Sequence, residues 1–420
     1  MEKITINDLP RLKKKYKMYE MKYLDFNVVE FSKDSEKILF MLDDVINSKP
    51  LLYMPNYNNS ILNIISSIKK YFNQTPDYNT FKPLDDILEC GKYNHIAIML
   101  LDGMGSKIID GNLDETHFLP KMKVCDFNAV FPPTTACAIP AANSGLEPLR
   151  TGWVGWSNYF SEVDKFVVMF RNQEYFSGEN LPINVRDIIP YEEFYNKLGV
   201  YSFDLGPYFT PSNCGSLKEV CDKYLLEINK HSKSYAYMYW NEPDAVMHIN
   251  GAYSLEAKEE INKLNNVLEE FYQKLPEDSL VIVTADHGHI DVNPIYLANY
   301  LDLLSMLERV PSNEGRCAFF KVKRNRRGCF RKLFNQYFSP FFTLLTKDEF
   351  IEEGYLGEEN IVNPKLHDFI GDYVAIAKST YYFNFSPNIF SQNDDELIFK
   401  SHHAGITLDE MVIPFIALKK

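Results

Sequence analysis

Three acidic residues lie at or just beyond the ends of apolar runs in this sequence. Asp102 follows residues 95–101 (HIAIMLL), Asp286 follows residues 280–285 (LVIVTA), and Asp244 comes shortly after residues 235–240 (YAYMYW). In open α/β sheets the ligand site lies beyond the carboxyl ends of the strands, so these carboxylates would meet at one rim. Carboxylates gathered there repel one another unless a cation lies between them. The pattern therefore predicts a metal site.

Histidines accompany these acids and would complete the ligand set. His248 lies four positions after Asp244, His287 directly follows Asp286, and His402 and His403 precede the last apolar run. A mixed set of carboxylate oxygens and imidazole nitrogens suits zinc or a similar divalent metal. Each residue also has an ordinary alternative, since an aspartate after a strand often caps the next helix and a lone histidine is usually packed or exposed. Agreement among several such residues favours the metal site.

A fourth segment, residues 129–145 (AVFPPTTACAIPAANSG), supplies a hydroxyl group. An apolar stretch ends at Phe131, and Thr134 and Thr135 then precede a run of small residues that can form a helix. A hydroxyl here can simply cap that helix. The same helix start also presents backbone N–H groups to a phosphate, and a threonine needs a base or a metal to become a nucleophile. The predicted metal cluster would supply that activation.

The apolar runs predict the architecture that brings these residues together. Continuous apolar runs at 95–101, 166–170, 235–240 and 280–285 are typical of strands buried on both faces of a parallel sheet. Residues 254–275 have helical spacing between two of these runs. We therefore predict an α/β fold with a mostly parallel central sheet sandwiched by helices.

The domain prediction divides the chain into four parts. Residues 1–90 are expected to form a mostly helical extension, with the clearest helix at 60–72, and residues 91–305 to form the catalytic core. Residues 306–398 are expected to form a small inserted α+β cap with strands at 318–322 and 373–377. Residues 399–420 would return to the core through a strand at 411–418.

Composition narrows the possible partners. The formal net charge of −13 argues against binding along a nucleic-acid polymer, although residues 321–332 form a basic run that is either solvated or attracts an anionic substrate. We found no apolar run long enough to span a bilayer and no signal-peptide pattern. The seven scattered cysteines fit a reducing compartment, so we predict a cytoplasmic protein. The sequence leaves the oligomeric state open.

The ordered motifs LLDGMG, VFPPTTA, PDAVMH, TADHGH and HHAG resemble those of the alkaline phosphatase superfamily, most closely its nucleotide pyrophosphatase/phosphodiesterase branch. The resemblance implies the corresponding fold and two divalent metal ions, zinc first, with manganese or magnesium as alternatives. It implies Thr135 rather than Thr134 as the nucleophile, and His403 rather than His402 as a ligand. By resemblance, one metal would be held by Asp244, His248 and His403, and the other by Asp102, Asp286 and His287.

The implied activity is hydrolysis of a small phosphorylated substrate, a phosphodiester or nucleotide pyrophosphate, through a phospho-threonine intermediate. The nucleotide-cleaving members place a phosphate-holding asparagine where this chain has Trp156, so Trp156 and the nearby Asn158 are the substrate-binding candidates. This departure leaves other activities open: a phosphomonoesterase, a phosphonate hydrolase, a mutase-like phosphoryl transferase, or a catalytically silent binding protein with the same fold.

Overall fold

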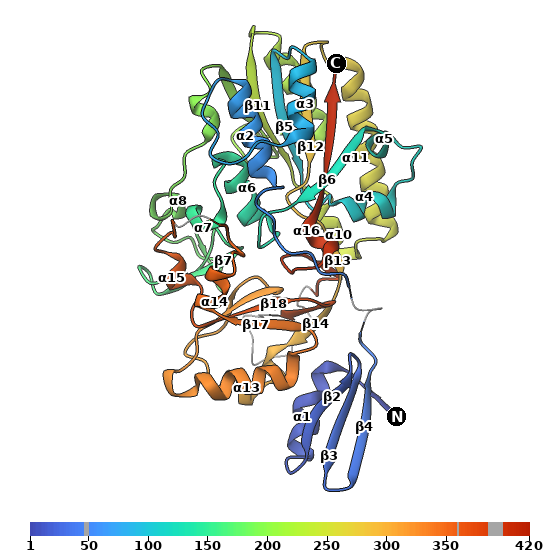
Figure 1. Cartoon of the computed structure of the whole chain (residues 1–420), viewed down its shortest axis with the longest axis vertical. Coiled ribbons are helices and arrows are strands. Elements are labelled where there is room, and N and C mark those ends of the chain that lie inside the picture. The colour runs from blue at the N-terminus through green and yellow to red at the C-terminus, as the bar shows by residue number, and fades with distance from the viewer. Residues whose placement is uncertain (46–49, 359–360, 385–397) are drawn as a thin grey trace.

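The computed structural model describes residues 1–45, 50–358, 361–384 and 398–420, and it is built around a six-stranded central sheet (Figure 1). In spatial order the strands are β10 (Tyr201–Leu205), β11 (Ser234–Trp240), β5 (His95–Leu101), β12 (Ser279–Thr284), β21 (Val412–Lys419) and β6 (Lys123–Asn128). Strands β10, β11, β5 and β12 are parallel, and β21 is antiparallel to both of its neighbours. The predicted α/β fold with a mostly parallel sheet is confirmed, including the return of the last strand.

Helices cover both faces of this sheet (Figure 1), which explains the continuous apolar runs. Every residue of β5 is buried, as expected for a strand covered on both sides. Around α11 (Leu255–Lys274) pack α4 (Ser106–Asn112), α5 (Phe118–Met122), α9 (Leu217–Ile228) and α10 (Asp244–Asn250). A second group consists of α2 (Ile61–Tyr71), α3 (Lys82–Cys90) and α6 (Thr135–Ser144). Helices α2 and α11 confirm the predictions for 60–72 and 254–275.

A seven-stranded sheet lies next to the core, and we call this sheet with the segments packed on it the second layer. Its composition corrects two predictions. Its strands, in spatial order, are β17 (Phe342–Thr346), β18 (Tyr373–Ala377), β16 (Cys317–Phe320), β15 (Ser312–Asn313), β7 (Ser157–Phe160), β8 (Lys165–Val168) and β9 (Gln173–Glu174). Residues 166–170 were predicted in the central sheet but contribute β8 here, because an apolar run does not reveal which sheet receives it. The 306–398 region is likewise not a self-contained insertion, since Asn313 of β15 pairs with Ser157 of β7.

The N-terminal segment also differs from its prediction. Residues 1–45 were expected to be mostly helical, yet they form a four-stranded sheet with the short helix α1 (Leu9–Lys15). The strands are β1 (Glu2–Ile4), β4 (Glu36–Leu42), β3 (Val28–Lys33) and β2 (Glu20–Asp25). Phe31 and Phe40 are buried in one apolar cluster with Tyr300 and Phe341 of the second layer. The turn-forming residues Asp34 and Ser35, which connect β3 to β4, were the missed hairpin signal, and Asp34 has a positive φ of 52°.

Shorter elements complete the second layer and the loops. The helices are α7 (Pro148–Thr151), α8 (Val185–Ile188), α12 (Leu301–Leu304), α13 (Arg327–Phe338), α14 (Lys347–Glu352), α15 (Leu366–Phe369) and α16 (Leu408–Met411). The strands are β13 (Ile290–Asp291), β14 (Asn293–Tyr296), β19 (Tyr381–Asn384) and β20 (Ser401–His402). Within the four described ranges, no helix combines the length and the apolar character needed to cross a bilayer.

Two close backbone contacts hold the loops that follow the central strands. β13 pairs with β20, with Ile290 opposite His402, and this pairing brings the HHAG segment beside the DHGH segment. Gly288 of DHGH lies against Gly105 of the DGMG turn, and a Cβ on Gly288 would lie 2.0 Å from the carbonyl oxygen of Asp409. These glycines therefore serve close packing of three loops around the carboxyl rim of the sheet.

Candidate metal centre and active site

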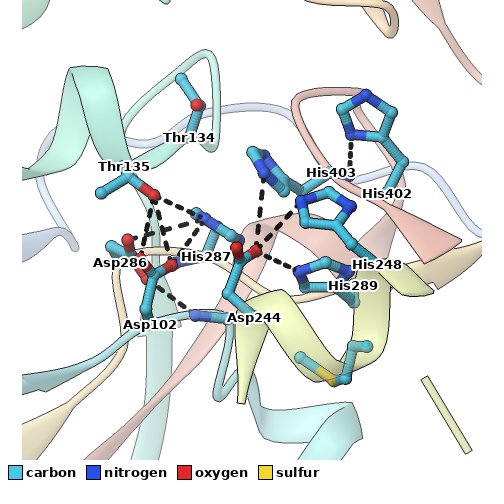
Figure 2. Close-up of polar contacts among 12 residues, drawn as sticks. Asp102, Thr134, Thr135, Asp244, His248, Asp286, His287, His289, His402 and His403 are labelled. Atoms are coloured by element: carbon cyan, nitrogen blue, oxygen red, sulfur yellow. Dashed lines mark hydrogen bonds and ion pairs between the residues drawn. The ribbon is translucent and has the colours of Figure 1, made fainter. Parts of the chain in front are cut away.

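The six predicted ligands converge at the carboxyl ends of the central strands (Figure 2). Asp102 follows β5, Asp244 and His248 lie on the first turns of α10, Asp286 and His287 follow β12, and His403 follows β20. The Nε2 atoms of His248 and His403 lie 3.3 Å and 3.7 Å from Asp244 Oδ1. The structure therefore brings together side chains separated by up to 301 positions in the sequence, from Asp102 to His403.

The second half of the site is centred on Asp102 and Thr135. The Thr135 hydroxyl lies 3.2 Å from Asp102 Oδ1 and 3.3 Å from His287 Nε2. His287 Nε2 also lies 3.3 Å from Asp102 Oδ1 and 3.5 Å from Asp286 Oδ2. The other oxygen of Asp286 accepts hydrogen bonds of 3.0 Å from the backbone N–H groups of Gly103 and His287, which fix that carboxylate in place.

Hydrogen bonds orient the predicted histidine ligands. Nδ1 of His248 lies 2.8 Å from the carbonyl oxygen of Ser401, Nδ1 of His287 lies 3.1 Å from that of Gly288, and Nδ1 of His403 lies 3.1 Å from that of Pro133. A carbonyl oxygen can only accept, so each Nδ1 must carry the proton. In the neutral rings, each Nε2 then turns an unprotonated lone pair toward a carboxylate. This arrangement of imidazole ligands with an outer acceptor is typical of metal sites.

The carboxylates show the same need for a cation. Burial raises the pKa of Asp102 well above its usual range, and the neighbouring charges of Asp286 and Asp244 raise it further. Burial would also raise the pKa of Asp244, but His248 and His289 hold it well below the usual value. Asp102 and Asp286 are 4% and 2% exposed, too buried for water to screen their repulsion. The donor set and its burial therefore fit divalent metal ions.

Thr135 is the first residue of α6, a helix of ten residues whose N-terminus faces the site. Thr134 occupies the N-cap position but makes no capping hydrogen bond. Its hydroxyl instead donates to Glu314 Oε1 at 2.8 Å. The first N–H groups of an α-helix have no partner within the helix, so this start of α6 can receive an anion. The structure therefore shows no side-chain cap of α6 by Thr134, which was the ordinary alternative for this pair of threonines.

Three residues at the site were missed from the sequence. His289, two positions after His287, lies with Nε2 2.7 Å from Asp244 Oδ1. Tyr239 of β11 donates a short hydrogen bond to Asp102. Glu314 approaches from the second layer. The position of His289 two residues after His287 could have identified it as a site residue. The positions of Tyr239 and Glu314 at the site depend on the packing of strands and sheets, which the sequence does not reveal.

A cavity of about 390 Å³ opens beside the candidate nucleophile. Its wall combines Thr135, Asp244, His248 and His403 with aromatic side chains and Glu314; the aromatic members are Trp156, Tyr175, Tyr382, Phe383 and Phe399. Trp156 is thus on the cavity wall, and its role in substrate binding stays a prediction. The lining found among the described residues includes no member of the basic run 321–332.

Asn158 does not match its prediction. It lies within β7, pairs with Val167 of β8 and is fully buried. It is not among the residues that line the cavity. Glu314, which does line the cavity, lies beside Trp156, because its Oε1 accepts a 2.7 Å hydrogen bond from the backbone N–H of Trp156. Asn158 is close in sequence to the expected asparagine position, but its place within β7 keeps it off the cavity wall.

Burial raises the pKa of Glu314 from an ordinary value of 4.5 to about 7. An acid with a raised pKa in the folded state binds its proton more tightly when folded, so the wild-type protein loses stability as the pH rises from about 4.5 to about 7. The effect amounts to about 3 kcal/mol. We predict that metal-free Glu314→Gln gains about this much over the wild type between pH 5 and pH 8, as measured by chemical denaturation. Parallel pH dependences in the two proteins would contradict the assignment.

The chain is similar to known proteins in part of its sequence and in its fold. The family model described as type I phosphodiesterase / nucleotide pyrophosphatase matches residues 217–396. Murine ectonucleotide pyrophosphatase / phosphodiesterase 5 is 18% identical, with a TM-score of 0.55, and the match covers 77% of this chain and 87% of that chain. Its inactive threonine-to-alanine variant in complex with AMP is 19% identical, with a TM-score of 0.55, covering 78% and 87%.

A second protein of known structure has a similar fold and a different activity in its name. Phosphonoacetate hydrolase from Sinorhizobium meliloti 1021, in complex with phosphonoacetate, is 14% identical, with a TM-score of 0.57, covering 78% of this chain and 90% of that chain. No curated protein matches the sequence. The predicted resemblance to the alkaline phosphatase superfamily and its nucleotide pyrophosphatase/phosphodiesterase branch is thus confirmed. The family match covers residues 217–396, which are 180 of the 420 residues.

Proposed function

We propose that this protein is a two-metal phosphohydrolase that cleaves phosphodiesters or nucleotide pyrophosphates through a phospho-threonine intermediate on Thr135. One observation carries the proposal. The Thr135 hydroxyl lies within 3.3 Å of both Asp102 and His287, at the N-terminus of α6 and on the wall of the cavity. A nucleophile, metal ligands and an anion-binding helix start therefore share one small space.

The metal ions would be held by two sets of residues. Asp244, His248 and His403 form one set, and Asp102, Asp286 and His287 form the other. Zinc suits these oxygen and nitrogen donors, with manganese or magnesium as alternatives. When bound, the ions lower the pKa of a coordinated hydroxyl or water and neutralise charge on the phosphoryl group.

The residues of this chain account for the other requirements of the reaction. The N–H groups at the start of α6 hold phosphoryl oxygens, as helix starts do in other phosphate sites. Thr135 Oγ1 loses its proton and forms a bond to phosphorus while the bond to the leaving alcohol or phosphate breaks, and the leaving oxygen takes up a proton. Water then attacks the same phosphorus, the bond from phosphorus to Oγ1 breaks, and Oγ1 regains a proton. Tyr239 fixes Asp102 through its hydrogen bond. The inactive threonine-to-alanine variant of the murine relative supports the role given to Thr135.

The activity is tested with three nitrophenyl substrates: a phosphodiester, a phosphomonoester and a phosphonate monoester. We expect the zinc-loaded protein to release nitrophenol fastest from the diester. The phosphonoacetate hydrolase neighbour keeps a phosphonate hydrolase as the second candidate, together with a phosphomonoesterase. Preference for the monoester would contradict the diesterase proposal, and no turnover of any substrate with metal bound would favour a binding protein.

The substrate is proposed to be a small phosphorylated molecule, since the cavity of about 390 Å³ is the size of a typical small-molecule site. The AMP bound by the murine variant supports a nucleotide. The seven cysteines are free thiols, which supports the proposed location in the reducing cytoplasm.

A further inference from the structure

The starting point is the hydroxyl group of Ser401, which lies between α10 and His289. Ser401 Oγ donates its single proton to the carbonyl oxygen of Met247 at 2.8 Å. The same oxygen lies 3.0 Å from Nδ1 of His289. Because the serine proton is already used, Ser401 must accept in the second contact, and Nδ1 of His289 must donate. The proton of the His289 ring is therefore on Nδ1.

This assignment leaves Nε2 of the neutral ring without a proton, although it lies 2.7 Å from Asp244 Oδ1. A bare nitrogen lone pair and a carboxylate oxygen repel at this distance unless a positive charge lies between them. His289 is fully buried, whereas the Asp244 side chain is 18% exposed. His248 and His403 present Nε2 to the same carboxylate in the same way, with Nδ1 held by a carbonyl oxygen.

The four residues have the ligand count and spacing of one metal ion. One ligand atom from each of Asp244, His248, His289 and His403 lies within 4.8 Å of all the others. We propose that His289 is a fourth protein ligand of the metal ion held by Asp244, His248 and His403. The inference rests on the metal centre of the proposed function and extends the three-residue set that the sequence motifs implied.

A fourth protein ligand makes the two halves of the centre unequal. Structural zinc sites usually have four protein ligands, whereas catalytic sites keep one position open for substrate or water. The His289 half would therefore hold its metal more tightly. The half formed by Asp102, Asp286 and His287 would have three protein ligands, whereas the cavity wall carries Asp244, His248 and His403 of the other half. Thr135 lies beside the half with three protein ligands, in contact with Asp102 and His287.

The first experiment uses the wild-type protein and needs no variant. Metal-free protein is loaded with one equivalent of zinc, and the number of imidazole ligands is counted by X-ray absorption spectroscopy. We expect three imidazoles and one carboxylate oxygen on the tightly bound ion. Two imidazoles would overturn the proposal.

The second experiment compares two alanine variants loaded with one equivalent of cobalt. In His289→Ala we expect the visible absorption bands of four-coordinate cobalt to weaken. We also expect the affinity for cobalt to fall by about 100-fold or more. Loss of a residue that only hydrogen-bonds to a ligand typically lowers metal affinity by no more than about 100-fold. His402→Ala is the matched control, because His402 is also buried near the site but belongs to neither candidate ligand group. Because Nδ1 of His402 accepts a 2.9 Å hydrogen bond from the backbone N–H of His403, we expect unchanged cobalt bands and a fall in affinity of no more than about 10-fold. An unchanged spectrum in His289→Ala would overturn the proposal.

These readouts are independent of turnover, so the two proposals can fail separately. If zinc binds with three imidazoles but no phosphorylated substrate is cleaved, the hydrolase proposal fails and the His289 assignment stands. If the protein is an active hydrolase with two imidazoles on the first zinc ion, the His289 assignment fails alone. Circular dichroism of each variant shows whether it is folded. If His289→Ala does not fold, the number of imidazole ligands counted in the wild-type protein decides the question.

Discussion

Replacement of Thr135 by alanine should lower kcat for a nitrophenyl phosphodiester by at least about 1,000-fold, in line with the loss seen when the nucleophile of other hydrolases is removed. The substitution removes the hydroxyl that lies 3.2 Å from Asp102 and 3.3 Å from His287, while all the proposed metal ligands remain. We therefore expect the metal content, measured by mass spectrometry, to stay at the wild-type value. Loss of turnover without loss of metal would show that Thr135 acts as the nucleophile and is not needed to hold the metal ions.

Thr134→Val is the matched control for this prediction. It removes the neighbouring hydroxyl, whose 2.8 Å hydrogen bond goes to Glu314 rather than to the metal ligands. We expect a loss of no more than about 10-fold, the scale of one uncharged hydrogen bond. In addition, acid quenching during turnover of the diester should trap on Thr135 a phosphoryl group that still carries the second ester group, detectable by peptide mass spectrometry in the wild type. Full activity of Thr135→Ala would rule out the phospho-threonine route.

The central sheet and the convergence of the ligands were predictable because one physical rule governs both. Strands buried on both faces must be continuously apolar, and β5 (HIAIMLL) and β12 (SLVIVT) follow that rule. The polar residue that ends such a run is then at the rim of the sheet. Asp102 and Asp286 could be placed near each other on this basis alone, without knowledge of any loop.

The second layer was less predictable because its strands are short and come from distant parts of the chain. β15 has two residues, and it links the 157–174 segment to the 312–377 segment through the pairing of Asn313 with Ser157. No periodicity reveals such a pairing. The placement of Glu314 on the cavity wall, and the exclusion of Asn158 from it, both follow from this sheet, so the sequence could not supply either.

The role of His289 was hidden for a different reason. Its position in DHGH is visible in the sequence, but its tautomer depends on Ser401, which lies 112 positions later and is brought close by the pairing of β13 with β20. The N-terminal sheet was missed because the helical pattern of residues 60–72 was taken to hold for all of residues 1–90, although residues 1–45 form strands. Local sequence patterns therefore predicted several helices and strands, whereas contacts between distant elements determined which residues lie at the site.

A buried ion pair connects the second layer to the loop that carries His403. The side chains of Arg316 and Glu410 are fully buried, with Nε to Oε1 and Nη2 to Oε2 distances of 2.6 Å and 2.8 Å. Nη1 of Arg316 also donates to the carbonyl oxygen of Tyr381 at 2.7 Å. Glu410 in turn accepts a 2.7 Å hydrogen bond from the backbone N–H of Gly405, two residues after His403.

Gly405 explains why the HHAG motif ends in glycine. A Cβ at this position would lie 2.8 Å from both Arg316 Nη2 and Glu410 Oε2. Only a residue without a side chain lets the loop approach the ion pair this closely. The pair therefore fixes the backbone that aims His403 at Asp244, and its loss should affect both folding and metal binding.

Arg316→Met should lower the free energy of unfolding by about 3–5 kcal/mol, because it leaves the Glu410 carboxylate buried without its charged partner. The double variant Arg316→Met, Glu410→Met should recover most of this loss, since two apolar side chains of similar size leave no buried charge. Urea denaturation of the metal-free proteins measures the folding effect, and zinc affinity should fall in both variants because Gly405 loses its acceptor or its support. Equal stability of Arg316→Met and wild type would show that water or another group reaches Glu410, and the ion pair would then have no part in positioning His403.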